Sequence, residues 1–150
     1  MAHSKNLGWA ALTVGIVLIL AQGWPEPVET TLEAPIITTG ADTALTTAIE
    51  ARSSGVAVSG QGRVVRILAD DLDGSRHQRV ILDIGRGCTL LIAHNIDLAP
   101  RLDSLQPGDT LAFNGVFEWN ERGGVVHWTH HDPRGIHAPG WLEFNGQRYQ

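Results

Sequence analysis

Four of the seven histidines of this chain lie within the stretch HWTHHDPRGIH, residues 127–137. Asp132 and Arg134 share the stretch. Neutral imidazole and carboxylate bind zinc and other divalent metals, and the same groups act as general acids and bases. The stretch therefore raises two hypotheses: a metal or catalytic site, or a hydrogen-bonded strand end.

The spacing of these histidines decides which of them can share one metal ion. VVHWTHH alternates as a β-strand does, which places Trp128 in the core and His127 and His131 on the outer face. Two residues four apart on a strand lie about 13 Å apart, too far to share a zinc ion with ligand bonds of about 2 Å. Asp132-Pro133 then breaks the strand, because proline cannot donate a ladder hydrogen bond.

The metal candidates are therefore His130, His131 and Asp132 around this break, with His94 from a neighbouring strand. His94 follows an apolar strand face, so we expect it at the rim of the core with a hydrogen-bond or metal partner. Zinc or another divalent metal held there would activate water for phosphoester hydrolysis. No named motif such as HExxH is present, and a His/Asp/Arg network that ties down the C-terminal segment is the alternative.

Other side chains suit a polar or anionic ligand. Arg76 and Arg79 flank His77, and arginine presents a bidentate fork to phosphate or carboxylate. Arg134 adds a further cation, and Trp141 is the tryptophan expected to offer an exposed stacking surface.

The elements that must position these residues are mainly strands. Alternating apolar residues predict five strands: VAVSGQGRVVRILAD, HQRVILDIG, CTLLIAHN, TLAFNGVFEW and VVHWTHH. The glycines in the first of these strands indicate a bend or bulge. IDLAPRLDSL predicts one helical turn near Pro100, between the third and fourth strands. This order is typical of an OB-fold, so we predict a mainly β fold with a five-stranded OB-like barrel over residues 54–131. An unrelated small barrel or sandwich is the alternative.

Two further elements complete a domain predicted over residues 42–150. Asp42 is expected to cap a short leading helix, with Leu45 and Ala48 on its apolar face. Near the other end, Asn145-Gly146 predicts a C-terminal hairpin with a two-residue type I′ turn.

The N-terminal segment indicates export. Residues 7–24 carry no charge and follow Lys5, so residues 1–23 are predicted to be a signal peptide or an N-terminal membrane anchor in an apolar helix. Residues 24–41 are rich in proline, threonine and glutamate, which predicts an acidic tether. We expect the domain outside the cytoplasm, either periplasmic or held at the inner membrane through residues 7–24.

The balance of acidic and basic residues indicates which kinds of molecule the domain can bind. The formal net charge is −5, and from Ser54 onward eleven acidic residues face nine arginines. Proteins that bind nucleic acid usually carry a clear basic excess, so this balance argues against nucleic acid as the partner.

Three motifs, GSRHQR, AHNIDLAPR and GGVVHWTHHDPRG, resemble a bacterial family of small exported proteins, domain of unknown function 3465. The resemblance covers residues 44–150. It implies one exported domain and assigns no catalytic residue.

Two functional hypotheses of different class follow. The first is a non-catalytic envelope module that binds a polar or anionic small ligand or an envelope component. The second is a metal-dependent phosphoester hydrolase that uses the His/Asp cluster. The first is preferred, because OB-like barrels more often bind than catalyse and the sequence contains no complete catalytic motif.

Overall fold

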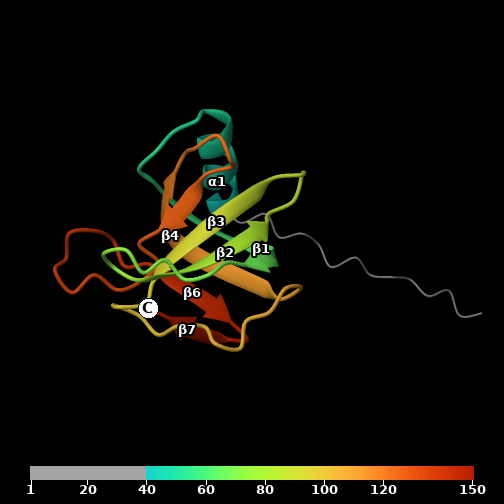
Figure 1. The fold of residues 1–150 in the computed structure, drawn as a ribbon. Coiled ribbons are helices and arrows are strands. Elements are labelled where there is room, and N and C mark those ends of the chain that lie inside the picture. The colour runs from blue at the N-terminus through green and yellow to red at the C-terminus, as the bar shows by residue number, and fades with distance from the viewer. Residues whose placement is uncertain (1–39) are drawn as a thin grey trace, which may run out of the picture. The chain divides into compact units, whose positions relative to one another are not determined.

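The computed structural model describes residues 40–150, and Figure 1 shows their arrangement. The elements in chain order are α1 (Gly40–Glu50), β1 (Val56–Ile67), β2 (His77–Asp83), β3 (Thr89–Asn95), β4 (Thr110–Glu118), β5 (Val125–His127), β6 (Trp141–Phe144) and β7 (Gln147–Tyr149). The predicted signal peptide or anchor lies outside the described residues, as does the tether up to residue 39. Within residues 40–150, no helix is long and apolar enough to cross a membrane.

The strands close into a five-stranded barrel. Their order is β1-β2-β3-β5-β4, and a pairing between β1 and β4 closes the circle. All neighbours are antiparallel except β3 and β5, which run parallel. This pairing is that of the predicted OB-like barrel. The hairpin of β6 and β7 extends the sheet from β4.

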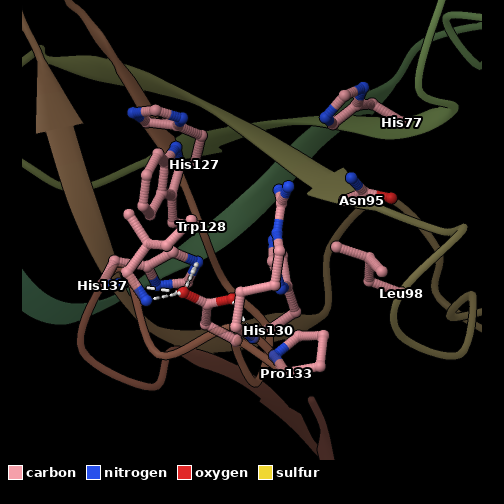
Figure 2. Close-up of a pocket in the computed structure, with 11 residues that line it drawn as sticks. His77, Asn95, Leu98, His127, Trp128, His130, Pro133 and His137 are labelled. Carbon is pink, nitrogen blue, oxygen red and sulfur yellow. Dashed lines mark hydrogen bonds and ion pairs between the residues drawn. The ribbon is translucent and has the colours of Figure 1, made fainter.

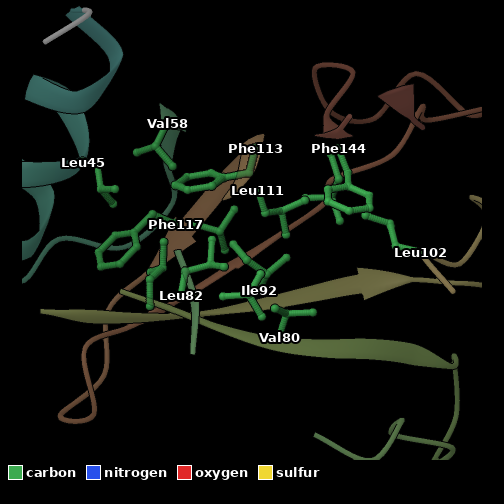
Figure 3. Close-up of a cluster of buried hydrophobic side chains, with 14 of the residues drawn as sticks. Leu45, Val58, Val80, Leu82, Ile92, Leu102, Leu111, Phe113, Phe117 and Phe144 are labelled. Carbon is green, nitrogen blue, oxygen red and sulfur yellow. The ribbon is translucent and has the colours of Figure 1, made fainter. Parts of the chain in front are cut away.

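Strict alternation of apolar residues builds the barrel interior. Along β4, for example, Leu111, Phe113 and Phe117 are fully buried, and the residues that alternate with the buried positions are half-buried or exposed. Figure 3 shows these side chains packed between Leu45 of α1 on one side and Leu102 and Phe144 on the other. Full burial of one such side chain contributes about 1.5–3 kcal/mol, so these side chains set the register of β4.

The long first strand serves two partners. Its first part pairs with β4 and its last part with β2, and the change of partner falls at Arg63. Gly62 is required there, because a Cβ would lie 2.8 Å from the backbone oxygen of Asp83. The predicted irregularity exists, but its register shift lies between Val64 and Arg66 rather than at the glycines.

The helical turn predicted near Pro100 is wrong. Residues 96–109 form turns instead. The side-chain amide of Gln78, only 1% exposed, bonds both the N–H and the C=O of Leu102 at 2.9 and 3.0 Å. These bonds tie Leu102 to β2, and its buried side chain packs into the core, so the connection follows the barrel surface.

The two flanking elements were predicted correctly, apart from one boundary. Helix α1 buries Leu45 and Ala48 as expected but begins at Gly40, two residues before the predicted cap at Asp42. At the C-terminal hairpin, Asn145 and Gly146 have φ values of 50° and 75°, which fit the type I′ turn.

Candidate functional site

Strand β5 ends at His127 rather than at His131 as predicted. Trp128 adopts a left-handed backbone conformation, with φ 57°, which a regular strand cannot include. Gly115 and Gly140 allow this, because a Cβ on either would collide with the carbonyl oxygen of His127 or Trp128, respectively. Residues 128–140 therefore leave the sheet as a segment that we call the histidine loop.

Asp132 holds the histidine loop from inside. Its side chain is 6% exposed and accepts hydrogen bonds from the backbone N–H groups of Arg134 and His137, at 2.8 and 2.9 Å, and from that of Ile136. Burial raises the pKa of this carboxyl, but the three hydrogen bonds together outweigh the effect of burial and lower the pKa to about 2. Asp132 is therefore ionised near neutral pH and its charge is directed at the loop backbone.

The histidine loop and the neighbouring ends of β2 and β3 enclose a cleft of about 320 Å³. Figure 2 labels most of its lining: His77, Asn95, Leu98, His127, Trp128, His130, Pro133 and His137. In Figure 2, His77, Asn95 and Leu98 lie along one side, and His127 and Trp128 lie along the other. A space of this size suits a small ligand.

Three cleft histidines have one ring nitrogen bound to the backbone. Nδ1 of His77, of His130 and of His137 lies 2.7–2.8 Å from the carbonyl oxygen of a residue one or two positions away. A carbonyl oxygen can only accept, so each Nδ1 carries the hydrogen. In the neutral ring, Nε2 then holds a lone pair, and no residue in 40–150 lies within hydrogen-bond distance of it.

His94 is different, since it is 0% exposed and both of its ring nitrogens have partners. Nε2 donates to the carbonyl oxygen of Pro100 at 3.2 Å, so Nδ1 accepts from the hydroxyl of Thr129 at 2.8 Å. Burial lowers the pKa of His94 to about 4, and the hydrogen bond to Pro100 opposes this only in part. His94 is therefore a neutral structural residue that connects β3 to the histidine loop.

His127 supports the aromatic wall of the cleft. Its ring packs edge-on against Trp128 with centroids 5.5 Å apart, and the ring of His137 lies 3.8 Å from Trp128. Nε2 of His127 is the one buried side-chain nitrogen or oxygen within residues 40–150 that lacks a hydrogen bond; Oε1 of Glu118 lies 3.7 Å away. Burial lowers the pKa of His127, and Glu118 partly opposes this.

The predicted ligand-binding residues divide into two groups. His77 and Arg134 line the cleft. Arg76 instead pairs with Asp97 at 2.6 Å, and Arg79 donates to a backbone carbonyl oxygen at 2.8 Å, so both guanidinium groups have internal partners. Sequence proximity to His77 does not bring them into the cleft.

Of the two tryptophans considered in the sequence, Trp128 rather than Trp141 lines the cleft. Trp141 lies on β6 beneath the guanidinium of Arg148, 4.3 Å from its ring centre, and is not part of the cleft lining. Trp128, predicted to lie in the core, is half-buried and lines the cleft. The left-handed conformation of Trp128 is the physical reason, because it removes the residue from the strand alternation.

The four predicted metal ligands are not brought together. Within residues 40–150, no group of three or more His, Cys, Asp or Glu side chains is arranged to hold a metal ion. Hydrogen bonds already occupy both ring nitrogens of His94, and Asp132 accepts three backbone N–H groups. His131 is exposed and not part of the cleft lining, whereas His130 lines it.

His127 and His137 were not predicted as site residues, although both lie in the histidine stretch of residues 127–137. The signal that could have found His137 is Asp132 followed by Pro133 and Gly135, a composition typical of a turn that folds back on itself. Such a turn places the histidines before and after it on the same cleft, as the structure does.

Two comparisons with known proteins bear on identity. A search of the curated proteins finds no match. A family model, described as "Protein of unknown function (DUF3465)", matches residues 30–150, which is most of the chain and includes the whole barrel and the histidine loop. The chain therefore belongs to the DUF3465 family.

Proposed function

We propose that this domain is a non-catalytic binding module that holds a small polar or anionic ligand in the histidine-loop cleft. The observation that carries the proposal is the cleft itself, about 320 Å³ and lined by His77, His130 and Arg134. Each of these side chains has polar atoms that no other described residue binds, so each can contact a ligand without breaking an internal hydrogen bond.

A metal-dependent phosphoester hydrolase is less well supported. That hypothesis needs His94 and Asp132 as ligands, and both already hold structural partners. Freeing His94 would leave the buried hydroxyl of Thr129 without its partner, which costs about 1–3 kcal/mol, and freeing Asp132 would release three backbone N–H groups of the histidine loop. Binding alone requires no such rearrangement.

We also propose that the domain acts outside the cytoplasm, as a periplasmic protein or anchored through residues 7–24. The uncharged segment after Lys5 supports this location. Fractionation of cells that express the full chain should find it in the periplasmic or inner-membrane fraction. Recovery in the cytoplasmic fraction alone would contradict this.

The binding proposal is tested by titrating ¹⁵N-labelled full-length protein with inorganic phosphate, citrate, glucose, N-acetylglucosamine and maltose. At least one probe should shift the NMR signals of the cleft imidazoles and the Trp128 indole. The double variant His130→Gln/Arg134→Gln should weaken that response, whereas Arg148→Gln, outside the cleft, should not. No cleft response to any of the five probes would overturn the proposal.

A further inference from the structure

The hydrogen-bond acceptors that line the cleft determine which ligand groups can bind there. Nδ1–H of His77, of His130 and of His137 is bound to a backbone carbonyl, so each neutral ring presents only a lone pair, at Nε2. Oδ2 of Asp132, which already accepts the backbone N–H groups of Ile136 and His137, lies 3.8 Å from Nε2 of His137 and adds a negative charge beside it. An anion also presents lone pairs, so these atoms cannot bind it while the rings are neutral. A hydroxyl group can donate to them.

The same cleft also offers donors. Oδ1 of Asn95 accepts the backbone N–H of Asp97 at 2.9 Å, which leaves the Asn95 amide N–H groups as its remaining polar function. In the described part of the chain, neither the guanidinium of Arg134 nor the indole N–H of Trp128 has a hydrogen-bond partner. A hydroxyl group both donates and accepts, so it can satisfy such a mixed lining.

The formal charges of the lining cancel. Arg134 contributes one positive charge and the ionised Asp132 one negative charge, while neutral histidines contribute none. A neutral ligand therefore leaves the electrostatic balance of the cleft unchanged. An anion would be attracted by one guanidinium and repelled by the nearby carboxylate.

The rim of the cleft is apolar. Leu98 and Ile136 are 49% and 66% exposed, and they are two of the four large hydrophobic side chains most exposed within residues 40–150. Both line this cleft, as does the half-buried ring of Trp128. Exposed apolar side chains gathered at one cleft mark a contact surface for an apolar part of a ligand. The C–H faces of a sugar ring offer such a part together with hydroxyl groups.

We infer that the cleft binds a neutral polyhydroxylated ligand of the carbohydrate class in preference to an anion. This inference rests on the proposed binding function and narrows its ligand. The hydroxyl groups donate to the Nε2 atoms and accept from Arg134 and Asn95, while C–H groups of the ring pack on Trp128 and the apolar rim.

The test compares affinities near neutral pH by calorimetric titration of the full-length protein. Glucose, N-acetylglucosamine and maltose are the neutral probes, and inorganic phosphate and citrate are the anionic ones. At least one saccharide should bind at least about tenfold more tightly than either anion, a difference of about 1.4 kcal/mol.

Two matched variants locate the interaction. His77→Phe keeps an aromatic ring but removes the Nε2 lone pair, and it should weaken saccharide binding about fivefold or more, as the loss of one hydrogen bond does. His131→Phe makes the same change at an exposed histidine outside the cleft lining and should leave binding unchanged. Circular dichroism of both variants checks that they remain folded.

The outcomes separate this inference from the binding proposal. Tighter binding of phosphate or citrate at the cleft overturns the inference and leaves the binding proposal standing. Saccharide binding that His77→Phe does not weaken also overturns the inference, because the contact then lies elsewhere. Failure of all five probes to bind overturns both.

Discussion

The buried histidine of the barrel and the histidines of the cleft differ in what surrounds their second ring nitrogen. Both nitrogens of His94 are bound, to Thr129 and Pro100. His77 and His130 each have one nitrogen bound to the backbone and one without a partner in residues 40–150. The number of internal partners, rather than closeness in sequence, thus distinguishes a structural histidine from one that can contact a ligand.

The largest effect should come from removing the structural histidine. His94→Ala leaves a buried cavity and removes the hydrogen-bond partner of two groups, the buried Thr129 hydroxyl and the carbonyl of Pro100. The free energy of unfolding should fall by about 4 kcal/mol, measured by urea denaturation. His131→Ala, an exposed histidine, is the matched control. Equal losses in the two variants would refute the structural role of His94.

Acidification of the unmodified protein should lower its stability through protonation of His94. The pKa of His94 is 6.5 when unperturbed and about 4 in the folded protein, so the unfolded chain binds one more proton between these values. The contribution of His94 is complete above its unperturbed pKa and is lost as pH falls through the folded pKa, a decrease of about 3 kcal/mol in stability.

The pH prediction is checked by denaturation across this range with His94→Gln as the comparison, since glutamine keeps a donor for Pro100. The variant should lose most of the pH slope. A smaller slope should remain from His127, whose pKa burial also lowers. An identical slope in both proteins would assign the proton uptake to other groups.

Asp132→Ala should loosen the histidine loop while sparing the barrel. The backbone N–H groups of Arg134, Ile136 and His137 lose their acceptor, so their amide hydrogens should exchange faster in hydrogen-exchange NMR. The melting temperature should fall less than in His94→Ala. Because the folded pKa of Asp132 is lowered to about 2, its contribution is present above its ordinary pKa of 3.8 and is lost as pH falls toward 2.

In that experiment, amides of β2 and β3 serve as the internal reference. They belong to the barrel ladder and should keep their protection. Unchanged exchange in the loop, or an equal increase in these strands, would contradict a local role for Asp132.

The smallest effect on stability is expected from a substitution of a cleft histidine. His77→Gln removes a half-buried ring with one backbone hydrogen bond, so the free energy of unfolding should change by no more than about 0.5 kcal/mol. Urea denaturation measures this. A loss close to that of His94→Ala would make His77 a structural residue and remove it from the candidate site.

Alternation made the barrel predictable. In β2 and β4, every second residue is buried, so the apolar pattern alone identifies the strand and its inner face. The connection after β3 was not predictable in this way. Its conformation depends on Gln78, which is distant in sequence and whose amide holds Leu102, a contact that local propensity does not contain.

The site was predictable only in part, for a related reason. The histidine stretch was identified, but its residues were assigned by continuing the strand pattern through Trp128. The left-handed conformation there depends on close approaches to Gly115, which lies in β4, and to Gly140, twelve residues further along the chain at the end of the histidine loop. Sequence periodicity predicts which face of a strand a residue lies on. It does not predict that contact with another part of the backbone will end the strand at a particular residue.

The short β5 strand also affects how this family can diversify. Because β5 ends at His127, most of the cleft lining comes from one continuous segment, the histidine loop, and the barrel contributes only a few side chains. Insertions and substitutions in such a segment leave the ladder hydrogen bonds intact, so specificity can evolve separately from folding. Transplanting residues 128–140, which include Gly140, into another small barrel would carry most of the recognition surface with it, provided that the host has a glycine where Gly115 stands.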